Sequence, residues 1–317
     1  MWRYLLRRVS FSIGLLFVVA TLLFFSIHLL PGDPVLLILG GDSAQPSPEQ
    51  IAMVTAKLGL DRPLWVQYAV WLGRLCQGDL GQSLVDDRPV ARDLANRLPR
   101  TLQLVIPATL VATAAGVSLA MFAARRRGRL ADPIASSTAL LGFSMPTFVV
   151  GMLLVALFSI TLGWLPPAGY VPWGEDPSGF LRHLILPALA LAAAPMAITM
   201  RMTRSSFLEQ ASLDYVRTAR AKGLTEPMVA WHHVLRNALL PIVTVVGLQI
   251  GGMFAGAVLV EYIFSWPGLN TLLLNSIGTR DYPIIQGVVL LAAVLFVFVN
   301  LVTDLCYAVI NPRIRYE

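Results

Sequence analysis

The sequence is short of charge, of lysine and of cysteine, and each shortage excludes a class of protein. Only 13% of its 317 residues are charged, while 56% are hydrophobic. Soluble globular chains carry about 25% charged residues. Too few charges are present to cover a soluble body of this size, so the sequence predicts lipid as the main solvent. The two cysteines, Cys76 and Cys306, are far apart and indicate neither a disulfide framework nor a metal pair.

Lysine occurs only twice, which excludes ATP hydrolysis by this chain. A phosphate-binding loop of the form G-x-x-x-x-G-K-[ST] needs a lysine directly after a glycine, and neither Lys57 nor Lys222 follows one. The H-E-x-x-H signature of metalloproteases and the G-x-S-x-G signature of serine hydrolases are missing as well. His232 and His233 are adjacent, so they point to different sides of a helix and are poor joint metal ligands. We therefore predict no catalytic residue, no cofactor and no metal site in this chain.

Long hydrophobic segments are what the sequence has in abundance. A membrane-spanning helix needs about 20 mostly apolar residues. The first apolar run is longer than the core of a signal peptide, and Pro31-Gly32-Asp33-Pro34 is not a small-residue cleavage site, so we expect this segment to be retained. The sequence predicts an all-α integral membrane protein with spans at 9–30, 102–124, 137–162, 184–203, 239–260 and 285–309.

The placement of basic residues predicts the orientation of these six spans. The opposite side of the membrane carries most of the acids, and its basic residues lie chiefly in the segment 31–100, which is too long to count for much in the rule. Both termini and the stretch 214–241 are therefore expected in the cytoplasm, and the net charge of +6 reflects topology rather than a nucleic-acid patch. The cytoplasmic side then holds Arg3, Arg7, Arg8, Arg125, Arg126, Arg127, Arg129, Arg313 and Arg315, besides the arginines of 214–241.

The external segment 31–100 is too long for a simple connection and has features of its own. Asp61-Arg62-Pro63 predicts a helix start, and apolar residues at helical spacing follow until Gly78. This stripe favours a helix that lies on the bilayer or on the protein's own outer rim. The alternative is a docking surface for a soluble partner outside the cell. Its candidate residues are Trp65, Tyr68, Trp71 and Asp79.

Three features inside the predicted spans also call for interpretation. Gly247, Gly251, Gly252 and Gly256 allow a helix to approach a neighbour closely, either in this chain or in a partner subunit. The run 142–146 (GFSMP) predicts a bend in the third span. Asp304 is an acid within the last span, and we favour a structural pairing with Arg313 over a proton relay.

The stretch 214–241 reads DYVRTARAKGLTEPMVAWHHVLRNALLP and is the longest polar run in the chain. Tyr215 to Lys222 is compatible with a helix that Gly223 ends. Thr225 then offers an N-cap for a second helix, with Glu226 and Pro227 in its first turn. Two short helices that meet at a glycine can fit a cleft in a peripheral subunit and carry motion from it. An ordinary loop that obeys the positive-inside rule explains the arginines equally well.

The stretch resembles the cytoplasmic coupling loop of ABC importer permease subunits. More closely, the chain resembles the dipeptide/oligopeptide/nickel permease family, in its dipeptide- or glutathione-permease-like branch. The resemblance covers nearly the whole chain in order. It rests on 214–224 and 235–241, and on Leu30-Pro31-Gly32-Asp33-Pro34, Leu58-Gly59-Leu60-Asp61, Gly78-Asp79-Leu80-Gly81, Arg201-Met202-Thr203-Arg204-Ser205-Ser206, Phe264-Ser265-Trp266-Pro267-Gly268, Arg280-Asp281-Tyr282-Pro283 and Asn311-Pro312-Arg313.

The resemblance implies the type I ABC importer transmembrane fold in a single permease subunit, 1–317. It implies an N-terminal span in 1–30, a periplasmic segment in 31–100, and a core transmembrane domain in 97–309 whose coupling loop is 204–238. The coupling residues would be Tyr215, Arg217, Thr218, Ala219, Arg220, Ala221, Lys222, Gly223 and Leu224.

The same resemblance implies partners, a location and a substrate class. The partners are a second homologous permease, two ATPase subunits that bind ATP and Mg at the cytoplasmic face, and an external substrate-binding protein. The location is the bacterial inner membrane, and the expected substrates are dipeptides or small peptides, with glutathione, oligopeptides and nickel as alternatives. A stand-alone channel or secondary carrier is the alternative from another class.

The chain departs from the broader importer pattern at one informative position. That pattern is Glu-Ala-Ala, three residues, Gly, nine residues, Ile, one residue and Leu-Pro. With its glycine on Gly223, only Ala219, Gly223 and Leu235 agree, and Arg217 stands where the glutamate would be. We therefore expect the corner itself but no partner contact through a glutamate at this position.

Overall fold

The structure is a computed structural model that describes residues 2–28, 35, 47–59, 61–125, 142 and 144–310. Within these residues the chain is helical and forms no strand, only an isolated antiparallel bridge between Gln82 and Pro89. Contacts divide the chain into two compact units, which are described separately below. The first is Met1–Arg100 with Gly268–Leu295, and the second is Thr101–Pro267 with Phe296–Glu317.

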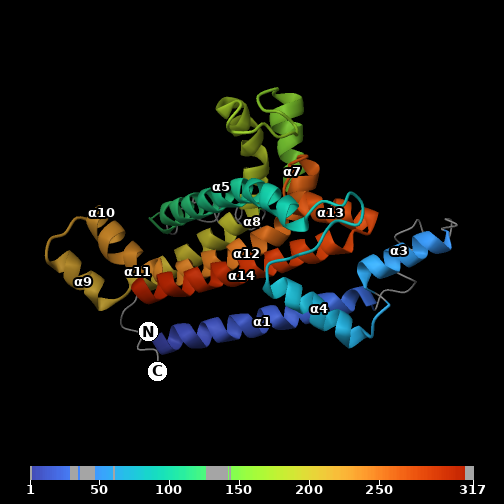
Figure 1. The fold of residues 1–317 in the computed structure, drawn as a ribbon. Helices are drawn as coiled ribbons and strands as arrows, with labels where there is room; N and C mark the ends of the chain where they lie inside the picture. The colour runs from blue at the N-terminus through green and yellow to red at the C-terminus, as the bar shows by residue number, and fades with distance from the viewer. Residues whose placement is uncertain are drawn as a thin grey trace. The chain divides into compact units, whose positions relative to one another are not determined.

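In the described part of the first unit, several helices precede the long helix α5, Val90–Arg125 (Figure 1). They are α1 (Trp2–His28), α3 (Pro48–Leu58) and α4 (Leu64–Cys76). The unit also holds α13 (Leu269–Thr279) and the first half of α14 (Tyr282–Ile310). Its core is a small cluster in which Val90 and Leu94 of α5 meet Leu269, Ile284 and Val288.

The start of α4 differs from the prediction, and α3 was not predicted at all. Asp61 does not cap α4: the helix begins at Leu64, Pro63 takes the cap position, and no side chain bonds to the first turn. The sequence reasoning missed α3, although Ser47 and Gln50 carry the spacing of a capping box. The Gln50 N–H donates to Ser47 Oγ at 3.2 Å, and the Ser47 N–H donates to Gln50 Oε1 at 2.9 Å.

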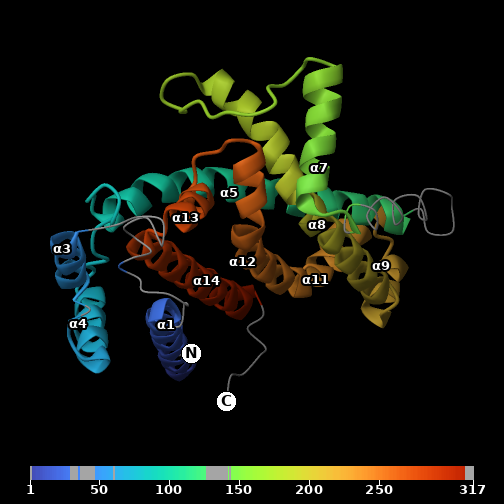
Figure 2. The same ribbon diagram turned by 90° about the vertical axis from the view of Figure 1, so that its right-hand side faces the viewer.

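The second unit is built on the long helix α8, Pro177–Ala211, which packs against α7 and α12. α7 (Thr147–Leu154) continues as the π-helix η2 (Val155–Thr161), and a loop joins it to the start of α8 (Figure 2). After α8 come α9 (Asp214–Ala221), α10 (Glu226–Met228), the π-helix η3 (Val229–Leu235), α11 (Arg236–Ala238) and α12 (Leu240–Ile263).

The largest apolar core lies in this second unit and explains one of the sequence motifs. Side chains of α5, α8 and α12 pack around Phe264 and Trp266, both of which are buried. The Phe264 carbonyl accepts the Gly169 N–H at 2.8 Å, and the Tyr170 ring lies edge-on to Trp266 with centroids 4.8 Å apart. The motif 264–268 (FSWPG) therefore holds the loop before α8 against the end of α12.

The described residues contain five helices long and apolar enough to cross a membrane, where we expected six spans. The five are Leu6–Ser26, Val90–Arg125, Pro177–Ala211, Leu240–Ile263 and Tyr282–Cys306. The remaining expected span, 137–162, is represented by the shorter apolar helix Thr147–Thr161, because most of 137–146 lies outside the described residues. The predicted bend at 142–146 also falls partly outside them, and Pro146 stands directly before α7 as its cap.

Candidate functional site

The glycine corner, defined as residues 214–238, follows the end of α8 (Figure 1). Its first limb is α9, and Gly223 ends this limb with a left-handed φ of +79°. The Gly223 N–H donates to the Arg220 carbonyl at 2.9 Å, and the Leu224 N–H donates to the Ala219 carbonyl at 3.4 Å. These two bonds are the Schellman closure of a helix. A side chain at position 223 would meet no neighbour within 4 Å, so the preference for glycine comes from the backbone alone.

The second limb begins at Glu226, one residue after Thr225, and runs through α10, η3 and α11. Thr225 occupies the expected cap position, but its side chain makes no capping bond. The sequence predicted an α-helix here, whereas the seven residues Val229–Leu235 are π-helical. Such segments are rare and often occur at functional sites.

An ion pair joins the two limbs across the glycine. Arg220 Nε donates to Glu226 Oε1 at 2.8 Å, and a second guanidinium nitrogen donates to Glu226 Oε2 at 3.3 Å. Both side chains are largely exposed, at 46% and 69%. Solvent screens such a pair, so it contributes little to stability, about 0–1 kcal/mol. Its two-pronged geometry still restricts the angle between the limbs.

The corner is amphipathic, and the nine predicted coupling residues therefore fall into three groups: buried, half-buried and exposed. The inner face packs Val216, Ala219, Val229 and Val234 into a cluster with helices α5 and α8. Ala219 is therefore a packing residue that a partner cannot reach. Tyr215 and Leu224 are half-buried. The exposed members, which a partner can contact, are Arg217, Thr218, Arg220, Ala221, Lys222 and Gly223.

The predicted external docking residues lie in two different environments. The Tyr68 hydroxyl is 2.8 Å from Thr21 Oγ1, and its ring stacks on Phe25 of α1. Trp71 contacts α1 through Phe24, with ring centroids 5.5 Å apart. These contacts favour the interpretation that the stripe lies on the protein's own rim. Trp65 points away from this contact and is 74% exposed.

Asp79, the remaining predicted docking residue, is exposed and contacts its own turn. Its carboxylate accepts the Gly81 N–H at 2.8 Å, which shapes the turn after α4. This turn leads into a ten-residue hairpin, 81–90, whose arms pair through Ser83 N–H to Arg88 C=O (2.9 Å) and Val90 N–H to Gly81 C=O (3.0 Å).

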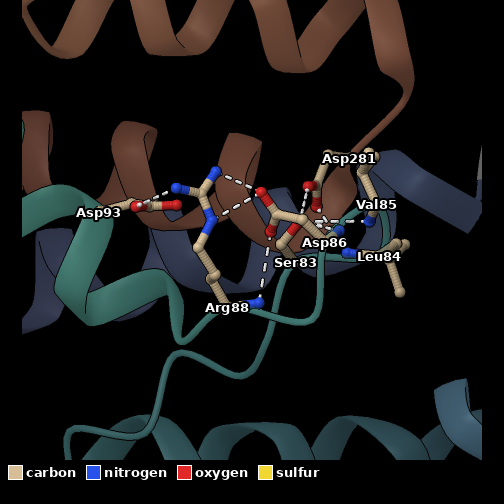
Figure 3. Close-up of polar contacts among 7 residues, drawn as sticks. All are labelled: Ser83, Leu84, Val85, Asp86, Arg88, Asp93 and Asp281. Atoms are coloured by element: carbon tan, nitrogen blue, oxygen red, sulfur yellow. Dashed lines mark hydrogen bonds and ion pairs between the residues drawn. The ribbon is translucent and has the colours of Figure 1, made fainter.

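A buried carboxylate holds this hairpin, and sequence reasoning missed the contact. Asp281, 2% exposed, accepts a hydrogen bond from Ser83 Oγ at 2.5 Å and another from the Leu84 N–H at 3.2 Å (Figure 3). Ser83 Oγ in turn accepts the N–H groups of Val85 and Asp86 at 3.2 and 3.3 Å. Ser83 and Asp281 are 198 positions apart, so no local pattern could link them. The only signal was that both lie in or beside motifs of the family resemblance.

Charge pairing extends from the hairpin to the start of α5. Arg88 pairs with Asp86 and lies 3.7 Å from Asp93 (Figure 3). The side-chain hydrogen bond from Arg88 lowers the pKa of Asp86 to about 2, and the same bond raises the pKa of Arg88. Asp93 is buried, and its Oδ2 has no hydrogen-bond partner in the described part of the chain. At the start of α8, the hydrogen bond from the Gly179 N–H is the main cause of the lowered pKa of Asp176.

The glycines of α12 differ in what they face. A Cβ at Gly247 would overlap the side chain of Thr303 in α14, and one at Gly251 would come within 2.6 Å of the Phe296 ring. These two glycines therefore pack within the chain. Gly256 is in ordinary contact distance of Leu191, at 3.7 Å, and Gly252 faces open space.

Sequence reasoning missed Gly116 as a packing glycine. A Cβ there would come within 2.8 Å of the Met196 carbonyl and within 2.9 Å of Thr199 Cβ, so α5 and α8 cross at this point. Arg313, the predicted partner of Asp304, lies outside the described residues. Within the described ranges, no group of three or more histidine, cysteine or acidic residues could hold a metal ion.

Comparison with known proteins identifies the family. Residues 116–316 match the binding-protein-dependent transport system inner membrane component, and residues 1–105 match the N-terminal component of such systems. The chain belongs to this family of transport permeases. The glutathione transport system permease protein GsiC of Salmonella typhi is 45% identical over 317 residues, with both chains covered completely. The dipeptide transport system permease protein DppB of Escherichia coli K12 is 43% identical over 340 aligned residues, again with both chains fully covered.

The helical fold of this permease also occurs in solved transporters. A chain of the MetNI methionine ABC transporter, in an inward facing conformation, superposes with a TM-score of 0.56 over 68% of this permease and 95% of that chain. An amino acid ABC transporter superposes with a TM-score of 0.50 over 70% and 94%. The identities of 15% and 18% are low, so this likeness shows the fold alone.

Proposed function

We propose that this permease forms, with a second homologous permease, the translocation pathway of an ATP-driven importer for dipeptides or other small peptides. The full-length similarity to both a glutathione and a dipeptide permease carries the proposal. We propose six spans with both termini in the cytoplasm of a bacterium, an external segment at 31–100, and a core domain at 97–309 that contains the coupling loop 204–238.

The glycine corner is the proposed contact with the ATPases. Two ATPase subunits, which bind ATP and Mg, would each receive one corner at the cytoplasmic face, and their closure would displace it. The exposed residues Arg217, Thr218 and Lys222 would face the ATPase, while the buried side of the corner passes the displacement to the spans. Arg217, whose guanidinium lies 3.3 Å from the Asp214 carboxylate, stands where the broader importer pattern has a glutamate, so the contact would be made without a glutamate at this position.

An external substrate-binding protein would deliver the peptide, and it would set most of the selectivity. Trp65 and Asp79 are the members of the proposed docking set whose side chains are exposed; Tyr68 and Trp71 would support them from the α1 side. Glutathione is a second candidate substrate, because GsiC is 45% identical to this chain over its full length, close to the 43% of DppB.

Reconstitution of the complete importer tests the proposal. The permease is assembled in proteoliposomes with the second permease, the ATPases and the binding protein of the importer. Uptake of labelled dipeptide and of labelled glutathione is then measured with and without ATP. We expect ATP- and binding-protein-dependent uptake of one or both. Solute movement by the purified permease alone would instead establish a stand-alone channel or secondary carrier.

A matched pair of variants at one position ties uptake to the corner. Gly223→Asn keeps the left-handed backbone that asparagine tolerates, and Gly223→Val does not. We expect near-normal uptake with the first and a loss of ATP-driven uptake with the second, although the variant still inserts in the membrane. Normal uptake with Gly223→Val would contradict the role of the corner in coupling.

A further inference from the structure

The Tyr215 hydroxyl lies where four segments of the second unit meet. It is 3.1 Å from Gln210 Oε1 in the last turn of α8 and 3.4 Å from the His233 carbonyl in η3. It also accepts a hydrogen bond from Asn237 Nδ2 in α11 at 3.2 Å. A phenol has one hydroxyl proton, so this proton is shared between Gln210 Oε1 and the His233 carbonyl. A lone pair of the same hydroxyl oxygen accepts the N–H of Asn237.

Asn237 completes a closed arrangement around one backbone carbonyl. Its Nδ2 donates to the His233 carbonyl at 3.1 Å as well as to Tyr215. The His233 carbonyl belongs to the π-helix, whose hydrogen-bond register differs from that of the α-helices on either side. Two side chains from outside η3 thus fix this irregular segment at its last turn.

The residues of this contact lie close to the ends of long apolar helices. Tyr215 is in the first turn of α9, the limb that leads to the exposed corner. Asn237 precedes the start of α12 by three residues, and Gln210 is the penultimate residue of α8. A second bond, Ser206 Oγ to the Ala238 carbonyl at 2.9 Å, joins α8 to α11 beside it. One hydroxyl therefore connects α9 to the end of α8 and, through Asn237, to the segment that leads into α12.

We propose that Tyr215 and Asn237 are positioning residues that transmit movement of the glycine corner to α8 and α12. The inference rests on the proposed function, because it assumes that an ATPase moves the corner. It assigns Tyr215 to the inside of the corner, as a link rather than as a surface that an ATPase contacts. It also gives Asn237, which lies beyond the predicted coupling residues, a role in coupling.

The test measures substrate molecules imported per ATP hydrolysed by the complete importer in proteoliposomes. Tyr215→Phe keeps the half-buried ring and removes the hydroxyl, and Asn237→Leu keeps the branching at Cγ and removes the amide. Both variants are expected to assemble and to hydrolyse ATP. Tyr215→Phe should import about 2- to 10-fold less substrate per ATP, the effect of one hydrogen bond. Asn237→Leu should show a smaller loss, because the Asn237 side chain is exposed to water. Since both act through the same contact, the double variant should lose no more than the worse single variant.

Tyr262→Phe is the matched control, because it removes an exposed hydroxyl from α12 at a distance from this contact. Its ratio of transport to hydrolysis should equal that of the wild type. An unchanged ratio in Tyr215→Phe, or losses that multiply in the double variant, would overturn the inference. So would failure of both single variants to assemble, because the residues would then hold the fold rather than transmit motion. A wild-type complex that imports no peptide would refute the proposed function itself. Import by the wild type is measured first, so this result is distinguished from a failure of the inference about Tyr215 and Asn237.

Discussion

Replacing Ser83 by alanine removes the donor that a buried carboxylate depends on. Ser83 is 1% exposed and Asp281 is 2% exposed, so water cannot readily take the place of the lost hydroxyl. A hydrogen bond to a charged group contributes about 1.5–3 kcal/mol, and a charge left short of a partner costs at least as much. The N–H groups of Val85 and Asp86 lose their acceptor as well. We therefore expect the hairpin 81–90 to open more easily by about 2 kcal/mol or more.

Hydrogen exchange of the hairpin amides measures this change directly. A difference of 2 kcal/mol corresponds to roughly 30-fold faster exchange, since 1.4 kcal/mol is about tenfold. The informative amide is that of Val90, because its acceptor, the Gly81 carbonyl, is untouched by the substitution. The permease is placed in lipid nanodiscs, and exchange is followed by mass spectrometry of peptides that cover 79–94.

The chain offers a matched control in a second serine–aspartate contact. Ser178 Oγ donates to Asp176 Oδ1 at 2.7 Å, but this pair is exposed. Water replaces an exposed hydroxyl, so Ser178→Ala should change exchange at the start of α8 by less than about fivefold. If Ser83→Ala and Ser178→Ala had equally small effects, the reasoning that burial makes the Asp281 contact strong would be refuted.

Other consequences can be measured on the same preparation. Gly223→Val should lower the stability of the corner by about 1–2 kcal/mol through backbone strain alone, whereas Gly223→Asn should cost clearly less; equal hydrogen exchange of α9 in both would contradict this. Gly247→Val overlaps a side chain of α14, so the free energy of unfolding should fall by about 1–3 kcal/mol. Gly252→Ala meets open space, so it should raise the thermal midpoint slightly, because alanine is favoured over glycine inside a helix by about 0.5–1 kcal/mol. Cys76 is exposed, so a membrane-impermeant maleimide should label it in intact spheroplasts after Cys306 is replaced by serine. Labelling that occurs only after permeabilisation would contradict the proposed orientation. The pKa of Asp86 is about 2 in the folded permease, below its ordinary value of 3.8. Its small contribution to the stability of the hairpin should therefore be complete above pH 4 and disappear as the pH falls towards 2. A loss of hairpin stability between pH 7 and 5 would show that another group is responsible.

Features set by neighbouring residues could be predicted from the sequence. The shortage of charge predicted a membrane protein, and the described residues include five helices that are long and apolar enough to span a membrane. The glycine corner was also predictable, because a helix end depends on the φ of one residue, and Gly223 supplies it. Such features depend on contacts within about five residues along the chain. The π-helical register of η3 escaped prediction because nothing in the sequence VAWHHVL distinguishes it from an α-helix.

Contacts between distant segments depended on how the helices pack. Tyr68 and Trp71 have the same spacing whether they face lipid, a partner or α1, and only the packed structure places them on α1. Likewise, Gly247 and Gly252 look alike in the sequence, yet one is filled by α14 and the other is open. The Ser83–Asp281 contact joins positions that no periodicity relates. Each of these depends on the crossing point of two helices or loops, and that point is set by the sum of many side-chain contacts rather than by any local pattern.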